Sequence, residues 1–494
     1  MQQDADVIVV GAGNAALCAA IAARNKGASV LVIEAAPQAE TGGNSAYTAG
    51  AMRFAFNGVD DIVALVPDLT DSDIANSDFG AYTEDAFFDD MFRVTQFRTD
   101  PLLVDLLVRN SFETLRWMKA QGVRFQTSHG RQAYKVDGKF KFWGGLACEV
   151  WGGGPGLVEM LAKSATQKGI EIRYETSARD LIYEDGKVTG IRVAHQGRHS
   201  ELYSKAVVLA CGGFESNAEM RARYLGPNWD LAKVRGTRFN MGYGHKMALG
   251  IGAMPYGHWS GAHAVGWEQN APSFGDLAVG DAYQKHSYPF GIMVNARGER
   301  FVDEGADFRN YTYAKYGREI LAQPDLFAWQ VFDRKVSNLL RDEYRIRQVT
   351  KVTANTIEEL AEKLEGVDPA GFLKTVEEFN AAVTVDVPFN PNIKDGRAAR
   401  GLRIPKSNWA NRIDEGPFEA YAITCGVTFT FGGLKISEQA EVESTEGQPI
   451  PGLFAAGEIV GGIFYHNYPG GTGLTSGAVF GKIAGEHAAG AAGF

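Results

Sequence analysis

The chain has 494 residues, a net charge of −10, and ordinary shares of hydrophobic (45%) and charged (22%) residues. This composition is typical of a globular protein of two or three domains, and the lack of a basic stripe argues against a nucleic-acid partner. Four widely spaced cysteines form no CxxC pair, which predicts free thiols in a reducing compartment. The apolar stretch of residues 5–23 has no basic leader and is interrupted by glycines, so we expect a cytoplasmic protein without an integral membrane segment.

The first 34 residues carry a nucleotide-binding pattern. A buried strand over residues 7–10 leads to Gly11 and Gly13, an Ala-rich helix and a second strand that ends at Glu34. Gly11 allows the tight turn, and Gly13 lets the backbone approach a pyrophosphate at the helix N-terminus. Glu34 is placed to accept hydrogen bonds from a ribose. The pattern predicts a dinucleotide site in a Rossmann-like fold but leaves NAD and FAD open.

Glycine-tipped segments recur far along the chain. "TGGNSAYTAGAM" (41–52) follows the second strand, and "KAVVLACGGF" (205–214) and "IPGLFAAGEIVGG" (450–462) are further buried strands that end in glycines. Such distant strand ends would converge on one long ligand, which favours FAD over a nicotinamide cofactor. The predicted cofactor-binding residues are Gly11, Gly13, Asn14, Ala15, Glu34, Gly42, Gly43, Asn44, Ser45, Ala210, Gly212, Gly457, Glu458, Gly473, Leu474 and Thr475.

Two local patterns lie outside these segments. Residues 355–383 show the apolar period of two amphipathic helices, separated at Gly366. Asp185 and Gly186 stand between two alternating segments, which predicts a β-hairpin.

The sequence resembles the fumarate reductase/succinate dehydrogenase flavoprotein family over nearly its whole length. The resemblance is carried by the glycine-tipped segments above and by "GYGHKMALGIGA", "MVNARGERFVDE", "TFTFGGLKI" and "GGTGLTSGAVFGKIAG". Within the family, "GERFVDEGADFRNYTYAKYGR", "CGVTFTFGG" and "YHNYPGGTGLTSG" look most like the tricarballylate dehydrogenase branch, and "YPGGTG" is similar to the flavin-dependent 3-ketosteroid dehydrogenases. The resemblance implies an α/β FAD-binding domain, residues 1–253 and 421–494, interrupted by an α+β capping domain, residues 254–420. It also implies FAD without a covalent link.

The family reaction interconverts a C–C single bond and a C=C bond next to a carboxylate, by hydride transfer to or from flavin N5 and a protein-mediated proton transfer. Arg309 falls near the arginine that family members use for the proton, but one residue further from Glu304 than usual. A free guanidinium stays protonated, so Arg309 would need a relay, for which Glu304 and Asp307 are candidates. The alternative is that Arg309 clamps a substrate carboxylate.

Residues before the last glycine cluster are further candidates. Aligned on Gly470, this chain has Tyr468 where fumarate reductases carry a carboxylate-binding arginine. Tyr468 and His466 would line the substrate side and bind a carboxylate or carbonyl or transfer a proton, although packing roles are about equally supported. A helix over residues 475–487 would direct its N-terminus at the flavin.

The segment "TFTFGG" departs from the family pattern. Phe429 replaces a substrate-binding histidine, whereas Thr430 is kept, and His258 and His263 could supply compensating donors. A bulkier or partly apolar acid therefore fits better than fumarate, and a tricarballylate-like polycarboxylate converted to an aconitate-like product is the preferred hypothesis. The alternatives are a ring-ketone desaturase and a flavin-binding partner module without turnover. No iron–sulfur, haem or other metal pattern is present, so electrons would pass to or from a separate partner or diffusible acceptor.

Overall fold

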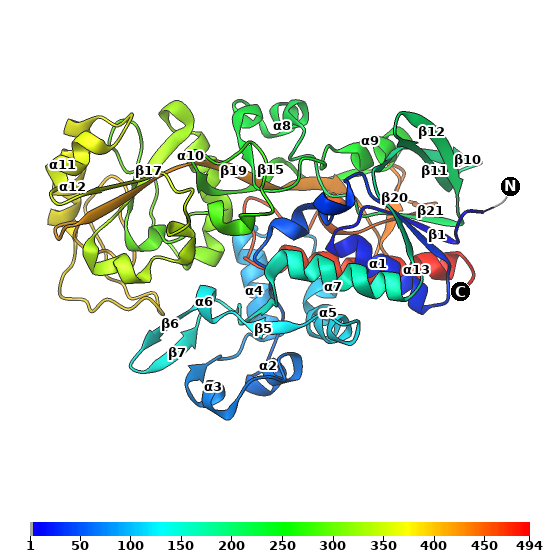
Figure 1. Ribbon diagram of the computed structural model, residues 1–494, viewed down its shortest axis with the longest axis horizontal. Coiled ribbons are helices and arrows are strands. Elements are labelled where there is room, and N and C mark those ends of the chain that lie inside the picture. Colours follow the sequence, from blue (N-terminus) through cyan, green and yellow to red (C-terminus); the bar gives the residue numbers. More distant parts are fainter. Residues whose placement is uncertain (1–2) are drawn as a thin grey trace.

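The computed structural model describes residues 3–494 and shows an elongated molecule with two large sheets (Figure 1). The two termini lie together at one end, and helices α11 (Ile357–Lys363) and α12 (Pro369–Ala382) lie at the other (Figure 1). These are the two predicted amphipathic helices, and Gly366 lies between them with a positive φ of 77°. One end of the molecule is thus built from both ends of the chain, and the other from its middle.

The sheet near the termini has six strands in the order β20-β21-β13-β1-β2-β9. At its centre, β1 (Val7–Val10) pairs in parallel with β13 (Ala206–Leu209) and with β2 (Val30–Ile33). All residues of β1 are buried, as expected for a parallel strand that is covered on both faces. The other strands are β9 (Glu171–Arg173), β20 (Glu441–Glu443) and β21 (Pro449–Ala455). The predicted Rossmann-like arrangement is therefore confirmed.

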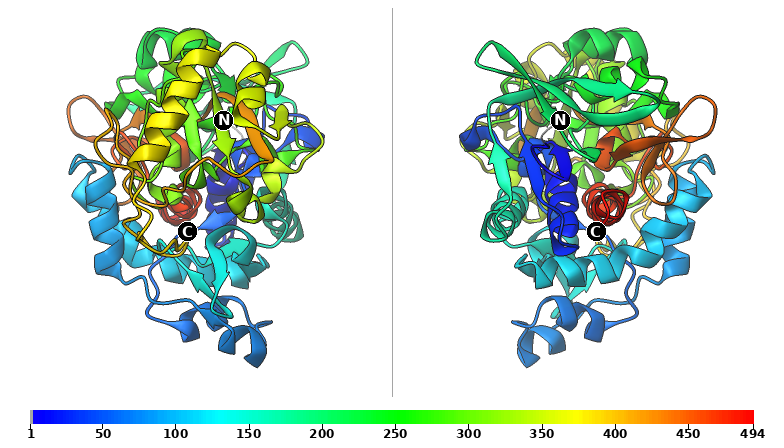
Figure 2. Two further views of the ribbon diagram at one scale, coloured as in Figure 1. Left: turned by 90° about the vertical axis from the view of Figure 1, so that its left-hand side faces the viewer. Right: turned by 90° about the vertical axis from the view of Figure 1, so that its right-hand side faces the viewer.

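Helices α1 (Asn14–Asn25) and α13 (Thr472–Ala491) pack against each other and against this sheet; Figure 2 shows them side by side, blue and red. Their backbones approach closely, because a Cβ at Gly481 would overlap the carbonyl oxygen of Ala15. The helix predicted over residues 475–487 is longer at both ends, since its small residues remain buried against α1 well beyond that range.

A small antiparallel sheet covers one side of the first. It consists of β10 (Thr176–Glu184), β11 (Lys187–His195) and β12 (Arg198–Tyr203). The turn between β10 and β11 has Asp185 at φ 50° and Gly186 at φ 80°, the two positive values that a tight two-residue hairpin turn requires. The predicted hairpin is confirmed.

The second large sheet is organised around one long strand, β19 (Phe418–Leu434). It pairs over much of its length with β15 (Pro255–Glu268) and also with β17 (Phe327–Phe332). The remaining strands are β14 (Lys233–Val234), β16 (Ile292–Val294) and β18 (Lys351–Ala354), and helix α10 (Tyr313–Leu321) packs on β15. The predicted domain boundary at residue 420 falls inside β19, so a continuous strand joins the two regions; the three-part division itself stays a prediction.

The segment from residue 51 to 167 forms helices and two small three-stranded sheets under the first sheet and beside the cavity described below. Its elements are β3 (Ala51–Met52), α2 (Val59–Leu65), α3 (Asp71–Ala75), β4 (Ser77–Asp78), α4 (Glu84–Val94), α5 (Pro101–Ala120), β5 (Phe125–Thr127), α6 (His129–Gln132), β6 (Ala133–Val136), β7 (Lys139–Phe142), β8 (Cys148–Val150) and α7 (Gly153–Gln167). Two helices follow β13, namely α8 (Ala218–Leu225) and α9 (Tyr243–Gly250). Within residues 3–494, no helix combines the length and the apolar character that crossing a bilayer requires.

Candidate active site

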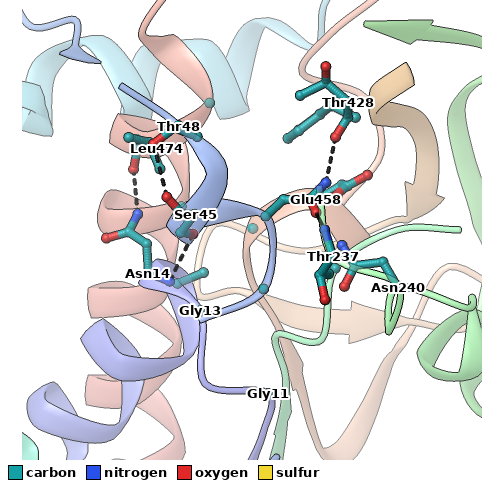
Figure 3. A pocket seen from close by; sticks show the side chains of 18 of the residues that line it. Gly11, Gly13, Asn14, Ser45, Thr48, Thr237, Asn240, Thr428, Glu458 and Leu474 are labelled. Atoms are coloured by element: carbon teal, nitrogen blue, oxygen red, sulfur yellow. Dashed lines mark hydrogen bonds between the residues drawn. The ribbon is translucent and has the colours of Figure 1, made fainter. Parts of the chain in front are cut away.

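One continuous cavity connects the ends of the first sheet's strands with the second sheet, and Figure 3 shows part of its lining. Most of the residues predicted from the sequence meet there. On the cofactor side these are Gly11, Gly13, Asn14, Ala15, Glu34, Gly43, Asn44, Ser45, Ala210, Gly212, Gly457, Glu458, Gly473 and Leu474; on the substrate side they are His263, Arg309, Phe429 and Tyr468. Gly42, Thr475, Thr430, His258 and His466 lie outside the lining.

The turn between β1 and α1 is fixed by its backbone. Gly11 has a φ of 108°, and a Cβ there would overlap the carbonyl oxygen of Ala210 on the neighbouring strand, so only glycine fits. At the end of β2, the two carboxylate oxygens of Glu34 accept hydrogen bonds from the amides of Ala12 and Ala36, each at 2.7 Å. Each oxygen keeps a lone pair for a further donor, such as a ribose hydroxyl.

Side chains then join segments that are far apart in the sequence. The side-chain amide of Asn14 donates to the carbonyl oxygen of Leu474 at 2.7 Å, and the backbone amide of Asn14 donates to Ser45 Oγ at 3.1 Å (Figure 3). Asn44 donates to the carbonyl oxygen of Thr428 at 2.6 Å and accepts from the amide of Thr237 at 2.9 Å. Hydrogen bonds of Asn14 and Asn44 thus hold together distant segments that are predicted from the sequence to meet through their glycines.

Thr430 holds a carboxylate instead of facing the cavity. Its backbone amide donates to Glu458 Oε1 at 2.7 Å, and its hydroxyl lies 3.1 Å from the same oxygen. A second buried carboxyl, Glu215, accepts from Asn44 at 2.6 Å. Burial raises the pKa of both Glu215 and Glu458, and the proximity of the two groups raises that of Glu215 further. The pair thus carries less than its full negative charge beside the cavity.

The cofactor end fits a dinucleotide with an extended shape. Glu34 lies at one edge, glycines leave the backbone bare between β1 and α13, and the N-termini of two long helices, α1 and α13, border the same cavity. At the start of α13 the hydroxyl of Thr472 is buried without a partner in the described part of the chain. Bare backbone, helix N-termini and an acceptor at the strand end are what FAD needs, so the residues present fit this cofactor.

The substrate end contains three arginines, two of which the sequence reasoning missed. Arg235 is buried and binds Asp281 through Nε at 2.7 Å and Nη2 at 2.6 Å. Arg131 lies 3.7 Å from Asp281 and 3.8 Å from Glu149. They were missed because Arg131 precedes β6 and Arg235 follows β14, in segments without a recognisable motif. Arg235 is thus paired with Asp281, whereas Arg131 only lies near two carboxylates, one of which, Glu149, has a pKa raised by burial.

Arg309 has no such balance. Nη1 donates to His286 Nδ1 at 3.3 Å and Nη2 to the carbonyl oxygen of Arg131 at 2.7 Å, and Nε is buried without a partner. The predicted relay through Glu304 and Asp307 is wrong. Glu304 binds Arg300 at 2.5 Å and Asp307 binds Arg93 at 2.7 Å. The turn η6 (Arg309–Tyr311) directs the guanidinium away from both carboxylates and into the cavity.

Two buried histidines border Arg309 and the tyrosines, and His286 was also missed. Since a guanidinium only donates hydrogen bonds, His286 Nδ1 must accept from Arg309, which leaves the proton on Nε2. Nε2 of His286 and Nε2 of His263 are both buried and unpartnered in the described chain. Burial, reinforced by neighbouring arginines, holds the pKa of both residues well below the usual value, so both are neutral at physiological pH. His286 therefore keeps a buried, unpartnered N–H beside the cavity.

Tyr468 is the centre of a hydroxyl network. Its oxygen accepts from the hydroxyl of Tyr313 at 3.1 Å and from the amide of Gly471 at 3.1 Å. With both acceptor positions used, the Tyr468 proton is free to be donated to a ligand. The Tyr468 ring is parallel to that of Phe429, with centroids 6.5 Å apart, and lies 4.8 Å from the ring of His263. The Tyr468 hydroxyl, a hydrogen-bond donor, therefore lies beside the aromatic rings of Phe429 and His263.

His466 and His258 interact with each other outside this lining. The His466 amide donates to His258 Nδ1 at 3.0 Å, and the ring centroids are 4.6 Å apart. His466 has a φ of 59° at a tight reversal in which the amide of Asn467 donates to the carbonyl oxygen of Tyr465 at 2.5 Å. Because of this reversal, the His466 side chain lies beside His258, whereas the Tyr468 side chain lines the cavity. The structure therefore does not bring either histidine to the cavity.

The chain is similar to several known proteins. It matches the family described as "FAD binding domain" over residues 6–474. It is 30% identical to a probable fumarate reductase of Shewanella frigidimarina, over 98% of this chain and 74% of that protein. It is also 30% identical to an NADH:fumarate oxidoreductase of Klebsiella pneumoniae over 98% of this chain, but it spans only 47% of that protein's length. A structure of a flavocytochrome c3 fumarate reductase in its open conformation superposes with a TM-score of 0.73 at 27% identity, covering all of this chain and 79% of the other.

The chain belongs to the FAD-binding flavoprotein family of fumarate reductase and succinate dehydrogenase, a class of FAD-dependent oxidoreductases that act on CH–CH groups. The predicted family and the predicted FAD cofactor are confirmed.

Proposed function

We propose that this protein interconverts a C–C single bond and a C=C bond next to a carboxylate, with non-covalently bound FAD. The observation that carries the proposal is that one cavity joins the nucleotide-binding turn at Gly11 and Glu34 to an unbalanced guanidinium, Arg309, and a free hydroxyl donor, Tyr468. FAD, when bound, supplies or accepts the hydride. The chain must then hold the carboxylate and move one proton.

Arg309 and His286 hold the carboxylate in this proposal. The Arg309 Nε and the His286 Nε2 are both unpartnered donors, and the two side chains are already joined at 3.3 Å. A carboxylate accepts hydrogen bonds from both without losing its charge, and the guanidinium gains a counter-ion. Binding at this point orients the acid so that its α and β carbons lie toward Tyr468.

Tyr468 handles the proton. Two donors, the Tyr313 hydroxyl and the Gly471 amide, point at its oxygen and stabilise the negative charge that develops when the proton leaves. Arg309 is a weaker candidate for this role, because its hydrogen bonds go to an imidazole and a backbone carbonyl and no carboxylate of the described chain is hydrogen-bonded to it. Burial raises the pKa of Tyr313, so Tyr313 stays protonated and acts as a donor.

The narrower hypothesis of a tricarballylate-like substrate comes from the resemblance of the segments around Arg309 and Tyr468. A second candidate, desaturation of a ring ketone, is favoured by the Tyr313–Tyr468 hydroxyl pair, which could polarise a carbonyl oxygen. A separate electron partner and a cytoplasmic location complete the proposal, supported by the absence of cluster- and haem-binding motifs in the sequence and by its cysteine pattern.

Turnover with a dye as electron acceptor separates these possibilities. The purified holoprotein is incubated with tricarballylate, with saturated monocarboxylates and with a 3-ketosteroid. Dye reduction by a carboxylic acid and not by the ketone supports the proposal. Dye reduction by the ketone alone supports the second candidate. Bound FAD that neither acids nor ketones reduce, together with unchanged behaviour of Arg309→Gln, would indicate a flavin-binding module without turnover.

A further inference from the structure

We infer that the substrate is a monocarboxylate that carries an aromatic or other bulky apolar group, rather than a di- or tricarboxylate. This inference rests on the proposed function and names the substrate class of the same site; it replaces the tricarballylate-like substrate, which is supported by the sequence resemblance alone. Three features carry it: the ion pairing of the arginines at the substrate end, the aromatic side chains of the lining, and the row of contacts that connects them.

The arginines of the substrate end differ in how closely carboxylates pair with them. Asp281 binds Arg235 at 2.6 Å and lies 3.7 Å from Arg131, which in turn lies 3.8 Å from Glu149. Arg309 is the remaining guanidinium of the lining; its polar contacts are to an imidazole and a backbone carbonyl, and no carboxylate of the described chain forms an ion pair with it. A buried charge is costly without a partner, so one carboxylate stabilises Arg309. A second carboxylate would meet Arg235, which is already bound to Asp281, or would have to compete for Arg131 with Asp281 and Glu149, which lie 3.7 and 3.8 Å from it.

An aromatic wall faces the rest of the substrate end. Phe429 and Tyr468 lie parallel, and Phe464 packs edge-on against both, with ring centroids 5.5 and 5.3 Å away. Tyr468 is only 8% exposed, so its ring is part of a rigid surface. Phe429 cannot donate a hydrogen bond to a carboxylate, and a carboxylate placed against it would be desolvated without compensation. An apolar or aromatic group gains free energy by the same contact.

A row of side-chain contacts connects Arg309 with the aromatic rings. Arg309 contacts His286 at 3.3 Å, the His286 ring lies 4.8 Å from Tyr313, and the Tyr313 ring lies 6.1 Å from that of Tyr468, which stacks on Phe429. This row of contacts leads from Arg309, which has no ion pair, to the rings of Tyr468 and Phe429. The cation near that second end, Arg235, is already bound to Asp281 and donates to the hydroxyl of Thr428 at 3.3 Å. The matching ligand has a carboxylate at one end and an apolar group at the other, with the reacting carbons between them.

Ligand titrations of the oxidised holoprotein test this inference. The probes are cinnamate (aryl monocarboxylate), crotonate (small monocarboxylate), fumarate and tricarballylate, each followed by the change in the flavin absorption spectrum. Cinnamate is expected to bind at least about tenfold more tightly than fumarate or tricarballylate, because it buries an aromatic ring and only one charge. Tighter binding of fumarate or tricarballylate than of cinnamate would overturn the inference.

Two variants locate the two ends of the ligand. Phe429→Ala should weaken cinnamate binding about tenfold more than it weakens crotonate binding, because only cinnamate has a ring to lose contact. Arg309→Gln should weaken both monocarboxylates. The matched control is Phe97→Ala, since Phe97 is 78% exposed and does not line the cavity; it should leave both affinities unchanged. Equal weakening of cinnamate and crotonate by Phe429→Ala, at unchanged flavin content and melting temperature, would also overturn the inference.

Failure of the inference and failure of the proposed function give different results. If the reduced flavin is reoxidised by fumarate or cis-aconitate faster than by cinnamate, the proposed function holds and the substrate class is wrong. If no unsaturated acid reoxidises it, the proposed function itself fails.

Discussion

The cofactor end of the cavity is formed mainly by backbone groups, whereas the substrate end is formed mainly by side chains. At the cofactor end the contacts are mostly backbone: bare glycine positions, helix N-termini, and amides that donate to Glu34 and Glu458. At the substrate end they are side chains, and the important ones are neutral histidines, tyrosine hydroxyls and one unbalanced guanidinium. A substitution that distorts the backbone at the cofactor end should therefore prevent FAD binding. A substitution of a side chain at the substrate end should instead alter the reaction and leave FAD bound.

The largest effect is expected for Gly11→Ala. A Cβ would overlap the Ala210 carbonyl oxygen, and the φ of 108° is strained for alanine, so FAD affinity should fall at least about a hundredfold. The flavin content of the purified protein measures the effect. Gly250→Ala is the matched control, since nothing lies within 4 Å of a Cβ there, and it should purify with full flavin content. Normal flavin content in Gly11→Ala would mean that the turn does not contact the cofactor.

Arg309→Gln should have the next largest effect, but on the reaction alone. Loss of the unbalanced guanidinium should lower kcat/KM for carboxylic acids at least about a hundredfold, the usual cost of removing one partner of a desolvated ion pair. Flavin content should stay normal. Arg345→Gln, at a side chain that is 59% exposed, is the control and should retain full activity. An Arg309→Gln variant that loses FAD would show that the two ends are not separable in this way.

Replacing Tyr468 and Tyr313 one at a time should distinguish the residue that transfers the proton from the residue that donates a hydrogen bond to it. Tyr468→Phe removes the proposed acid and should lower kcat about a hundredfold with a small change in KM. Tyr313→Phe removes only one donor to the Tyr468 oxygen, so we expect a loss in kcat of about tenfold. Equal losses in both variants would contradict the assigned roles.

The smallest expected effect is on stability at mildly acidic pH. The pKa values of His263 and His286 are lowered in the folded state, so below about pH 6.5 the unfolded chain binds protons that the folded chain does not. The contribution of these two histidines to the free energy of unfolding should therefore fall as the pH drops from 7.5 to 5.5, by up to about 1.4 kcal/mol per histidine and pH unit. Chemical denaturation at several pH values measures this slope.

His286→Asn sharpens the same test. The variant cannot take up the proton, so its stability should fall less steeply with decreasing pH than that of the natural protein. The buried carboxyls of the cofactor end act in the opposite direction, because a raised pKa in Glu34 or Glu215 favours the folded state as the pH falls. Equal slopes in the variant and the natural protein would show that His286 is not held neutral by its surroundings.

The contrast between the two ends also explains what could be predicted from the sequence. Gly11, Glu34 and Glu458 were found because backbone requirements leave a short-range pattern of strand, glycine and acidic residue. Arg131, Arg235 and His286 were missed because nothing near them in the sequence marks their function. Only the fold brings them to one cavity.

Two wrong or unsupported predictions have local causes. The relay from Arg309 to Glu304 and Asp307 was inferred from proximity in the sequence, but each carboxylate binds another arginine once the chain folds. His466 lies two residues before Tyr468, yet the reversal at φ 59° sends it to His258 instead. In both cases the direction of a side chain depends on a turn whose geometry is not encoded in residue spacing.

The most direct test of the central claim is a single-turnover experiment under anaerobic conditions. The FAD of the purified holoprotein is reduced, excess reductant is removed, and the flavin spectrum is followed after addition of an α,β-unsaturated acid. We predict that the oxidised spectrum returns, that one saturated acid forms per flavin, and that the step slows at least about a hundredfold in Arg309→Gln. A reduced spectrum that persists with every unsaturated acid tried would contradict the assignment of this cavity to C=C chemistry beside a carboxylate.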